Sequence, residues 1–340
     1  IAVKEAEKKE SNPKPAALPQ NPNLPLISIL HTGGTIASKV DYETGAVKAS
    51  FEPESLLEMF PDLNKKARIK SRLIGNMLSG DLNFNHFNKI AESIKEEIEK
   101  ENPAGIIITH GTDTMAYSTS AVSFILSGLT TPVIYVGAQR SSDRPSSDAE
   151  LNLLCAVNFI VSSDFGEIGI CMHKSSSDDV CNILPAHKTR KMHSSKRGTF
   201  QPINTTAWAE ATKDTVKILL TDYSKKILPN PAIKLMKFNP KIRVGMIKMR
   251  PNIFADEVLF YQNYDGLIIE GTGLGNAPVN FTDDYTAENE KILLAITALA
   301  KKIPVAMSSQ CIYGRVNMNI YSYGKKLLKA GVIGNLSDMH

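Results

Sequence analysis

Three short segments of this chain hold hydroxyl, carboxylate and amine side chains that could act together. The segment "HTGGTIAS" (31–38) contains Thr32 and Thr35, "THGTDTM" (109–115) contains Thr112 and Asp113, and "HKTRKMHSSKR" (187–197) is rich in lysine and arginine. A threonine hydroxyl is a weak nucleophile at neutral pH unless a base accepts its proton. A lysine amine can be that base where burial and nearby positive charge favour its neutral form. The segments indicate nucleophilic attack by threonine if the fold brings them together.

The glycines of the first segment also raise the alternative of a phosphate-binding loop. "HTGGTIAS" lacks the Lys-Ser/Thr pair with which a P-loop holds phosphates and metal. A second glycine-rich segment, "GTGLGN" (271–276), has GxGxG spacing and no complete βαβ unit with an acidic ribose partner around it. Neither loop has the residues that nucleotide binding requires.

The polar residues of the other two segments have simpler interpretations as well. Thr112 and Asp113 follow an apolar run and are residue types that commonly cap the N-terminus of a helix. The basic segment fits a solvated loop or an RNA contact; its cations are Lys188, Arg190, Lys191, Lys196 and Arg197. Only proximity to Thr112 would make one of its lysines catalytic, and sequence spacing does not reveal proximity.

The elements between these segments predict how they are positioned. The apolar runs at 26–30, 105–111, 132–138 and 168–173 read as buried strands, and helical periodicity marks 82–101, 114–128 and 147–162. Continuous apolar strands that alternate with helices are typical of a parallel sheet covered on both faces. Ligands bind such sheets beyond the carboxyl ends of the strands, where the polar segments at 31–38, 109–115 and 137–143 are expected.

The chain is predicted to divide into a large and a small α/β domain. The first 25 residues, charged and then proline-rich, are expected to form a linker after a further N-terminal domain. The large domain is expected at 26–223, a proline-containing connection at 224–240, and the smaller domain at 241–340. The small domain should hold strands at 242–249, 266–273 and 303–309 and a helix at 286–302, and the chain is expected to continue past His340.

Composition excludes several classes of protein. With 42% hydrophobic and 22% charged residues the chain is ordinary for a globular protein, and its net charge of +4 is too small for a dedicated nucleic-acid binder. Cys155, Cys171, Cys181 and Cys311 form no CxxC pair and are expected to be buried or half-buried reduced thiols. We find no signal peptide and no apolar run long enough to span a bilayer, which predicts a cytoplasmic protein without a metal site.

Two of these motifs resemble those of a known family. "TGGTI" (32–36) and "HGTDTM" (110–115) are the two signatures of the bacterial-type L-asparaginases, and the similarity extends from about Leu26 to the end of the chain. Within that superfamily, "ASKVDYETGAV" (37–47) and "GAQRSSDRPSSDAELNL" (137–153) resemble most the D subunits of archaeal glutamyl-tRNA(Gln) amidotransferases. The resemblance implies an L-asparaginase-like fold, with a large parallel-sheet domain and a smaller C-terminal α/β domain.

The resemblance also implies catalytic roles. Thr35 matches the primary nucleophile, and Tyr42 matches the tyrosine of a mobile loop that closes over it. Thr112, Asp113 and Lys191 match a second cluster that relays a proton. Lys191 is chosen over its neighbours by its distance to the "TF" at 199–200, and the charges of Lys188 and Arg190 are expected to favour its neutral form.

Further positions match substrate-binding residues of the family. Ser79 matches a serine that contacts the substrate's α-carboxylate, and Asn276 matches a substrate-side asparagine of a neighbouring subunit. Backbone N–H groups at Gly34 and Gly111 are expected to stabilise the oxyanion formed on the attacked amide. Two departures stand out: Gly80 replaces a glutamine of the secreted enzymes, and "YGRVNMNIYSYG" (313–324) lacks their acidic residue at the dimer interface.

The resemblance implies an amidohydrolase that releases ammonia from glutamine or asparagine. A tRNA-binding, ATP-using partner similar to the E subunit of such complexes would use that ammonia to convert Glu-tRNA(Gln) to Gln-tRNA(Gln), within a heterotetramer built on a homodimer of the present chain. No cofactor is expected in this chain, whereas ATP and Mg are expected in the partner, which would also hold the tRNA. Two alternatives remain: a free-standing cytosolic L-asparaginase, and a non-catalytic tRNA-docking scaffold that uses the basic segment at 188–197.

Overall fold

The computed structural model describes most of the chain. The described residues are 20–33, 36, 38–40, 47–49, 60–142, 144 and 146–338, with the backbone alone for 38–40 and 47–49. Most of the predicted N-terminal linker and three residues of the predicted site, Gly34, Thr35 and Tyr42, lie outside the described residues. Among the described residues, no helix is long and apolar enough to cross a membrane.

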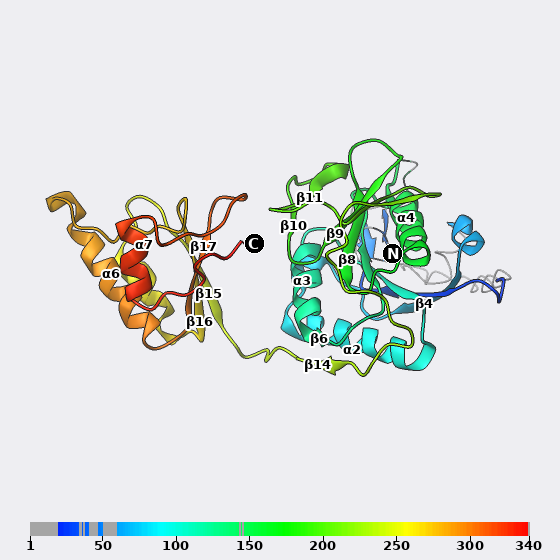
Figure 1. Ribbon diagram of the computed structural model, residues 1–340, viewed down its shortest axis with the longest axis horizontal. Coiled ribbons are helices and arrows are strands. Elements are labelled where there is room, and N and C mark those ends of the chain that lie inside the picture. The colour runs from blue at the N-terminus through cyan, green and yellow to red at the C-terminus, as the bar shows by residue number, and fades with distance from the viewer. Residues whose placement is uncertain are drawn as a thin grey trace, which may run out of the picture.

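An eight-stranded sheet forms the centre of the first body, which we call the large domain (Figure 1). Its strands are β1 (Leu26–His31), β4 (Arg68–Leu73), β5 (Gly105–Thr109), β7 (Val133–Val136), β8 (Ile168–His173), β9 (Cys181–Pro185), β12 (Ala209–Ala211) and β13 (Val216–Ile218), in the order β13-β12-β9-β8-β7-β5-β1-β4. The five strands from β4 to β8 are mutually parallel, while β9, β12 and β13 extend the sheet antiparallel. The carboxyl ends of β1, β5, β7 and β8 therefore share one edge.

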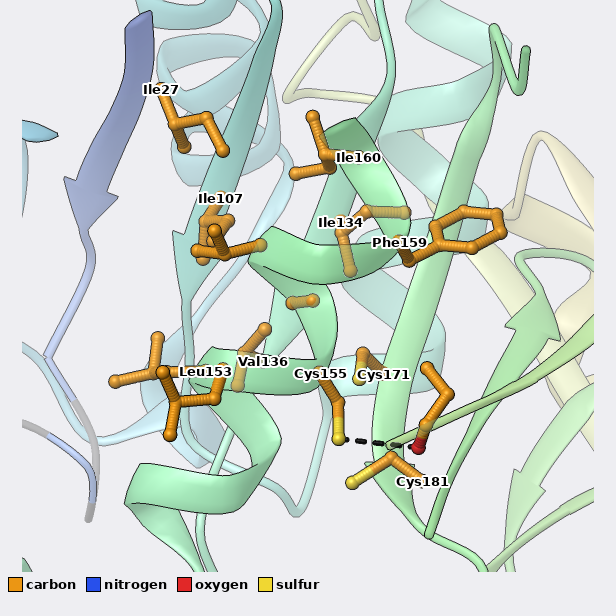
Figure 2. Packing of buried hydrophobic residues seen from close by; sticks show 14 of the residues in the cluster. Ile27, Ile107, Ile134, Val136, Leu153, Cys155, Phe159, Ile160, Cys171 and Cys181 are labelled. Atoms are coloured by element: carbon orange, nitrogen blue, oxygen red, sulfur yellow. Dashed lines mark hydrogen bonds between the residues drawn. The ribbon is translucent and has the colours of Figure 1, made fainter. Parts of the chain in front are cut away.

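Helices cover both faces of this sheet, which explains why its strands are apolar at successive positions. Helix α4 (Ala149–Ser162) packs on one face, where Leu153 and Phe159 lie among Ile107 and Ile134 of the strands (Figure 2). Helices α2 (Phe84–Glu101) and α3 (Met115–Ile125) cover the other face. Alternate residues of one strand thus enter different cores, as Ile107 and Ile108 do.

Shorter elements surround the large sheet. The hairpin of β10 (Thr189–Lys191) and β11 (Phe200–Pro202) carries the basic segment, with the single turn η4 (Arg197–Thr199) before β11. The turn η3 (Ser79–Asp81) precedes α2. Other short elements are η2 (Pro61–Lys65), β2 (Ser38–Val40) paired with β3 (Val47–Ala49), and β6 (Leu126–Ser127) paired with β14 (Lys234–Leu235).

The second body, the small domain, is a three-stranded parallel sheet with helices. Its elements are β15 (Val244–Lys248), α5 (Ala255–Leu259), η5 (Phe260–Asn263), β16 (Gly266–Gly271), η6 (Asp284–Thr286), α6 (Ala287–Ala300), β17 (Val305–Ser309) and α7 (Ser322–Lys329). A separate apolar cluster holds it together, with Ile269, Ile296 and Leu327 fully buried. The predicted connection at 224–240 lies along the large domain, where Phe238 exchanges hydrogen bonds with Asn88 of α2.

The small domain touches the large one at the base of the β10–β11 hairpin. Asn204, just after β11, accepts a hydrogen bond from the Gly314 backbone N–H at 2.8 Å and donates one to the Gly314 carbonyl at 2.7 Å. Lys188, just before β10, forms an ion pair with Asp338 at 3.0 Å. Figure 1 shows the C-terminal segment returning toward this hairpin.

Two expectations need correction, and the prediction of a parallel sheet gains a detail. The helix expected over 114–128 ends at Ile125, because Leu126 and Ser127 pair with Lys234 and Leu235 as a strand. The large sheet is mainly parallel, as expected, and β9, β12 and β13 are added to it through antiparallel pairing. Cys311 is exposed, although the other three cysteines are buried free thiols as expected.

Candidate active site

Thr112, Asp113 and Lys191 lie together at the carboxyl edge of the large sheet. The Lys191 Nζ donates to Thr112 Oγ1 at 2.9 Å and to Asp113 Oδ1 at 2.7 Å. Thr112 is 7% exposed and the Lys191 side chain 14%, whereas the Asp113 carboxylate is 78% exposed. The hydroxyl and amine are thus shielded while the carboxylate opens to the solvent side. A lysine placed between a hydroxyl and a carboxylate can exchange a proton with the hydroxyl, while the carboxylate stabilises the positive charge of the lysine.

The structure does not use Thr112 and Asp113 as helix caps. Helix α3 begins at Met115, and its N-cap residue is Thr114, whose side chain makes no capping hydrogen bond. Thr114 Oγ1 instead donates to the Ser79 carbonyl at 2.7 Å and ties the turn η3 to the start of α3. Thr112 and Asp113 therefore remain available to Lys191.

Ser79 and Gly111 are in close contact beside this cluster. A Cβ on Gly111 would lie 2.7 Å from Ser79 Oγ and 2.8 Å from Ser79 Cβ, closer than side chains pack. Gly137, just after β7, would likewise place a Cβ 2.9 Å from Thr112 Cγ2. Both glycines let polar groups approach where any side chain would push them apart. Around Gly80, by contrast, a Cβ would meet no other atom within 4 Å.

The first threonine of "TGGTI" has a structural role. Thr32 Oγ1 donates to the Thr109 carbonyl at 2.8 Å, and Thr32 N–H donates to the same carbonyl at 3.1 Å, which joins the ends of β1 and β5. Gly33 follows with φ +105°, and a Cβ there would lie 2.6 Å from the backbone of Met77. Thr32 and Gly33 thus lie beside the end of β5, and Thr112 follows that end by three residues.

Two buried histidines flank the strand ends. Burial lowers the pKa of His31 to about 4, and its ring nitrogens contact Thr109 Oγ1 at 2.9 Å and Ser71 Oγ at 2.7 Å. Burial likewise lowers the pKa of His110 to about 4, although the bond to the Gly111 carbonyl acts in the opposite direction. Both rings are therefore neutral near pH 7 and serve as hydrogen-bonding supports for the loops beside them.

Carboxylates neutralise most of the basic segment. Lys188 pairs with Asp338, Lys191 with Asp113, and Arg197 with Asp178. The Lys188 amine is thus paired with a carboxylate of the small domain. This pairing leaves little positive charge for the RNA-docking alternative.

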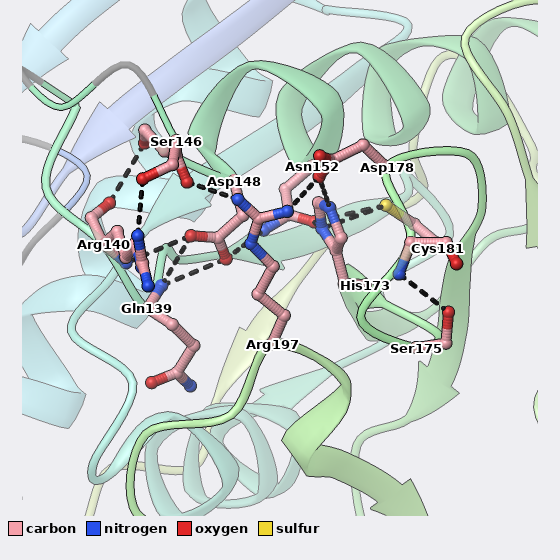
Figure 3. Close-up of polar contacts among 12 residues, drawn as sticks. Gln139, Arg140, Ser146, Asp148, Asn152, His173, Ser175, Asp178, Cys181 and Arg197 are labelled. Carbon is pink, nitrogen blue, oxygen red and sulfur yellow. Dashed lines mark hydrogen bonds and ion pairs between the residues drawn. The ribbon is translucent and has the colours of Figure 1, made fainter.

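A polar network, which the sequence did not predict, connects the loops after β7 and β8 (Figure 3). His173, at the end of β8, contacts Asn152 Oδ1 through Nδ1 at 2.6 Å and Asp178 Oδ1 through Nε2 at 3.1 Å. Asp148 accepts hydrogen bonds from the backbone N–H groups of Gln139 and Arg140 at 3.0 and 3.1 Å. Gln139, Arg140, Asp148 and Asn152 fall within the quoted segment 137–153, and His173 ends the strand expected at 168–173, but the sequence does not show that they meet.

Asn276 lies away from this cluster, in the small domain. It follows β16 and exchanges backbone hydrogen bonds with Thr272, both at 2.9 Å. Across the described part of the chain, no group of three or more His, Cys, Asp or Glu side chains could hold a metal ion.

Comparison with known families and structures agrees with this architecture. The family model described as "Asparaginase, N-terminal" matches residues 26–223, and the "Glutaminase/Asparaginase C-terminal domain" matches residues 243–339. The L-asparaginase of Thermococcus kodakarensis superposes with a TM-score of 0.78 at 28% identity, covering 91% of this chain and 87% of that one. L-asparaginase I of Vibrio cholerae gives a TM-score of 0.79 at 27% identity, with coverages of 93% and 89%.

Curated relatives share more sequence with this chain. The D subunit of the glutamyl-tRNA(Gln) amidotransferase of Thermococcus kodakarensis is 42% identical over 334 residues, which cover 97% of this chain and 72% of that protein. The corresponding D subunit of Methanothermobacter thermautotrophicus is 41% identical over 323 residues, with coverages of 94% and 70%. Both domains of the chain thus match one family in sequence and in fold, and the chain belongs to the asparaginase/glutaminase family that includes these D subunits.

Proposed function

We propose that this chain is the ammonia-releasing subunit of a tRNA-dependent amidotransferase. It would hydrolyse the side-chain amide of glutamine, or of asparagine, and supply the ammonia to a partner that amidates Glu-tRNA(Gln). The observation that carries this proposal is the contact of Lys191 Nζ with both Thr112 Oγ1 and Asp113 Oδ1. The 42% identity to a protein named as the D subunit of such an amidotransferase supports the choice of reaction.

The proposed chemistry has two halves, and Thr35 is the nucleophile that we assign. Its Oγ attacks the amide carbonyl carbon, and backbone N–H groups at Gly34 and Gly111 stabilise the oxyanion that forms. The amide nitrogen then takes up a proton and leaves as ammonia, which gives the acyl-threonine ester. Water then hydrolyses the acyl-threonine ester and restores the hydroxyl. Thr112 and Lys191 relay the protons, and Asp113 stabilises the lysine when it is charged.

We assign the substrate's charged groups to the residues around this cluster. Ser79, held over Gly111, would contact the α-carboxylate, and the exposed Asp113 carboxylate would hold the α-amino group. Tyr42 would close over the site, and Asn276 would reach it from a neighbouring subunit. These four side chains carry the specificity for an amino-acid amide rather than a simple amide.

We propose the remaining features of the assembly on the same basis. The partner is a tRNA-binding, ATP-using protein similar to the E subunit of such complexes and also supplies Mg. Two copies of the present chain form a homodimer core, and the complex works in the cytoplasm. Several relatives are named as parts of a tRNA amidotransferase, which supports this assembly, and the paired state of the basic segment leaves tRNA binding to the partner.

The decisive experiment uses the complex purified with its partner. Thr35→Val and Lys191→Ala variants should lose at least about a hundredfold in glutamine-dependent conversion of Glu-tRNA to Gln-tRNA, because each removes a group that acts in the reaction itself. Conversion with free ammonium chloride should persist, since it bypasses the site in this chain. Full glutamine-dependent activity in either variant would refute the site assignment.

An ammonia-release assay on the chain alone and on the complex separates the alternative of a free-standing L-asparaginase. The structural likeness to two L-asparaginases gives that alternative its support. Rapid ammonia release from asparagine by the chain alone, unchanged by partner and tRNA, would favour it. Ammonia release that depends on the partner and on charged tRNA would favour the amidotransferase.

A further inference from the structure

The loop that follows Lys191 is fixed by three consecutive residues of η4. Thr199 Oγ1 accepts a hydrogen bond from the His193 N–H at 2.7 Å and closes the loop on itself. Gly198 lies so close to the neighbouring turn that a Cβ would meet the Lys174 carbonyl oxygen and Ser175 Cα at 2.8 Å. The third residue, Arg197, is the one whose side chain contacts other loops.

Arg197 connects the loop to two other loops at the same edge of the sheet. Its Nη1 donates to Asp178 Oδ1 in the loop after β8, and its Nη2 donates to the Ser146 carbonyl in the loop after β7 (Figure 3). The side chain is only 17% exposed, whereas Asp178 is 65% exposed. The guanidinium holds the pKa of Asp178 below its usual range, with a smaller contribution from His173. A planar guanidinium can bridge two acceptors in this way, and an ammonium cannot do so with the same geometry.

Three hydrogen bonds and one packing contact lead from Asp178 back to Thr112. Asp178 contacts His173 Nε2 at 3.1 Å, His173 Nδ1 contacts Asn152 Oδ1 at 2.6 Å, and Asn152 Nδ2 donates to the Gly137 carbonyl at 2.9 Å. Gly137 lies directly against Thr112, because a Cβ on Gly137 would come within 2.9 Å of Thr112 Cγ2. The hairpin that carries Lys191 and the loop that carries Thr112 are therefore joined through Asp178 and the buried side chains of His173 and Asn152, as well as through the Lys191 contact itself.

We propose that Arg197 is a positioning residue that holds the β10–β11 hairpin so that Lys191 reaches Thr112 and Asp113. This inference rests on the proposed function, because it assigns Arg197 a role only through Lys191. Arg197 does not touch the reacting atoms. Removal of the Arg197 side chain leaves the Lys191 side chain intact but allows the backbone of Lys191 to move. A displacement of about 1 Å at a reacting group can lower a rate about a hundredfold.

The test compares Arg197→Gln with Arg197→Lys in the purified complex, with glutamine as amide donor. Arg197→Gln should lower kcat at least about tenfold and leave KM within about twofold, because substrate-binding groups stay in place. Arg197→Lys should fall between this variant and the parent, since it keeps the charge opposite Asp178 and loses the bridge to Ser146. Asp178→Ala, which removes the other side of the contact, should lower kcat in the same way.

A double variant and a neighbouring control make the result specific. Arg197→Gln combined with Asp178→Ala should be no slower than about the slower single variant, because both act through one contact. Lys196→Gln removes the adjacent exposed cation, whose side chain makes no ion pair in the described part of the chain, and should leave kcat unchanged. Multiplicative losses in the double variant, or equal kcat for Arg197→Gln and Lys196→Gln, would overturn the proposal.

The outcome can be separated from a failure of the proposed function. If Lys191→Ala is inactive and Arg197→Gln is as fast as the parent, the proposed function stands and the role of Arg197 is wrong. If Lys191→Ala is fully active, the site assignment itself is wrong. Should Arg197→Gln fail to fold, Arg197→Lys and Asp178→Ala still test the role of Arg197. If these variants lower only the thermal unfolding midpoint and keep a normal kcat, Arg197 does not position Lys191.

Discussion

At the scale of single residues, the Lys191–Asp113 ion pair differs from an ordinary surface ion pair because Lys191 also contacts the Thr112 hydroxyl. Exposed pairs contribute little, typically below about 1 kcal/mol, and nothing in such a pair requires a hydroxyl. Here the lysine is largely shielded and lies between a buried hydroxyl and an exposed carboxylate. That arrangement fits proton transfer better than stabilisation of the fold.

The two buried histidines predict how stability depends on pH. In the unfolded chain each would titrate near its ordinary pKa of 6.5, whereas His31 and His110 titrate near 4 when folded. The unfolded state therefore binds more protons between these values, and the free energy of unfolding falls as the pH falls from 6.5 toward 4. The slope approaches about 1.4 kcal/mol per pH unit for each histidine.

Denaturant unfolding at pH 7, 6 and 5 measures this slope. Fluorescence of Trp208, the single tryptophan of the chain, reports the large domain in which both histidines lie. His31→Gln should reduce the pH dependence, since one of the groups that bind a proton on unfolding in this range is gone. A large domain equally stable at pH 7 and pH 5 would contradict the burial of these rings.

The sequence could predict the residues of the cluster, although not their contacts. The types and motif positions of Thr112, Asp113 and Lys191 are visible in the sequence, and the resemblance selects Lys191 among five cations. What joins Lys191 to Thr112 is a separation of 79 positions closed by folding, which spacing alone does not encode. His173 stayed unnoticed for the same reason, and Arg197 was noted only as one cation of the basic segment, since the partners of both come from other loops.

At the scale of elements, the close packing of Ser79 against Gly111 predicts that a side chain at position 111 weakens substrate binding. Gly111→Ala should displace Ser79, because the new Cβ would lie 2.7 Å from its Oγ. A hydrogen bond to a charged group contributes about 1.5 to 3 kcal/mol, so KM for the amide donor should rise about tenfold or more. Steady-state kinetics with the purified complex measures this rise.

Ser79→Ala is the matched variant for this experiment. It removes the hydroxyl without crowding the turn, and should raise KM to a similar extent while the thermal unfolding midpoint stays close to that of the parent. If Ser79→Ala left KM unchanged, Ser79 would not bind the substrate, and any defect of Gly111→Ala would reflect distortion of η3 alone.

The predicted elements were right where strong periodicity or a long apolar run marked them. The helical period of 82–101 and the apolar runs at 105–111 and 132–138 correspond to α2, β5 and β7. Strand β4 was missed because its sequence, "RIKSRL", keeps polar residues at an edge of the sheet where one side faces solvent. Short strands such as β10 have too few residues to show any period.

At the scale of the whole molecule, the contact of Asn204 with Gly314 predicts how the domains depend on each other. Asn204 has φ +56°, so Asn204→Gly keeps its backbone conformation and removes only the side chain that binds the small domain. In calorimetry, the transition of the small domain should shift to lower temperature relative to that of the large domain, since it loses contacts made across the interface.

Asn252→Gly provides the control for that substitution. Asn252 also has a positive φ, +58°, and lies exposed in the small domain away from the hairpin. It should leave the interval between the two transitions unchanged. An equal shift in both variants would mean that the Asn204 contact does not couple the domains.

The β10–β11 hairpin is anchored at both ends, and this has a consequence for communication across the molecule. Its base is fastened to the small domain through Asn204 and Lys188, and its tip to the loops after β7 and β8 through Arg197. The hairpin therefore connects the small domain to the loops of the large sheet, and Lys191 lies between these two points of attachment. A partner that rotates the small domain by a few degrees would move the backbone that carries Lys191, without entering the site itself.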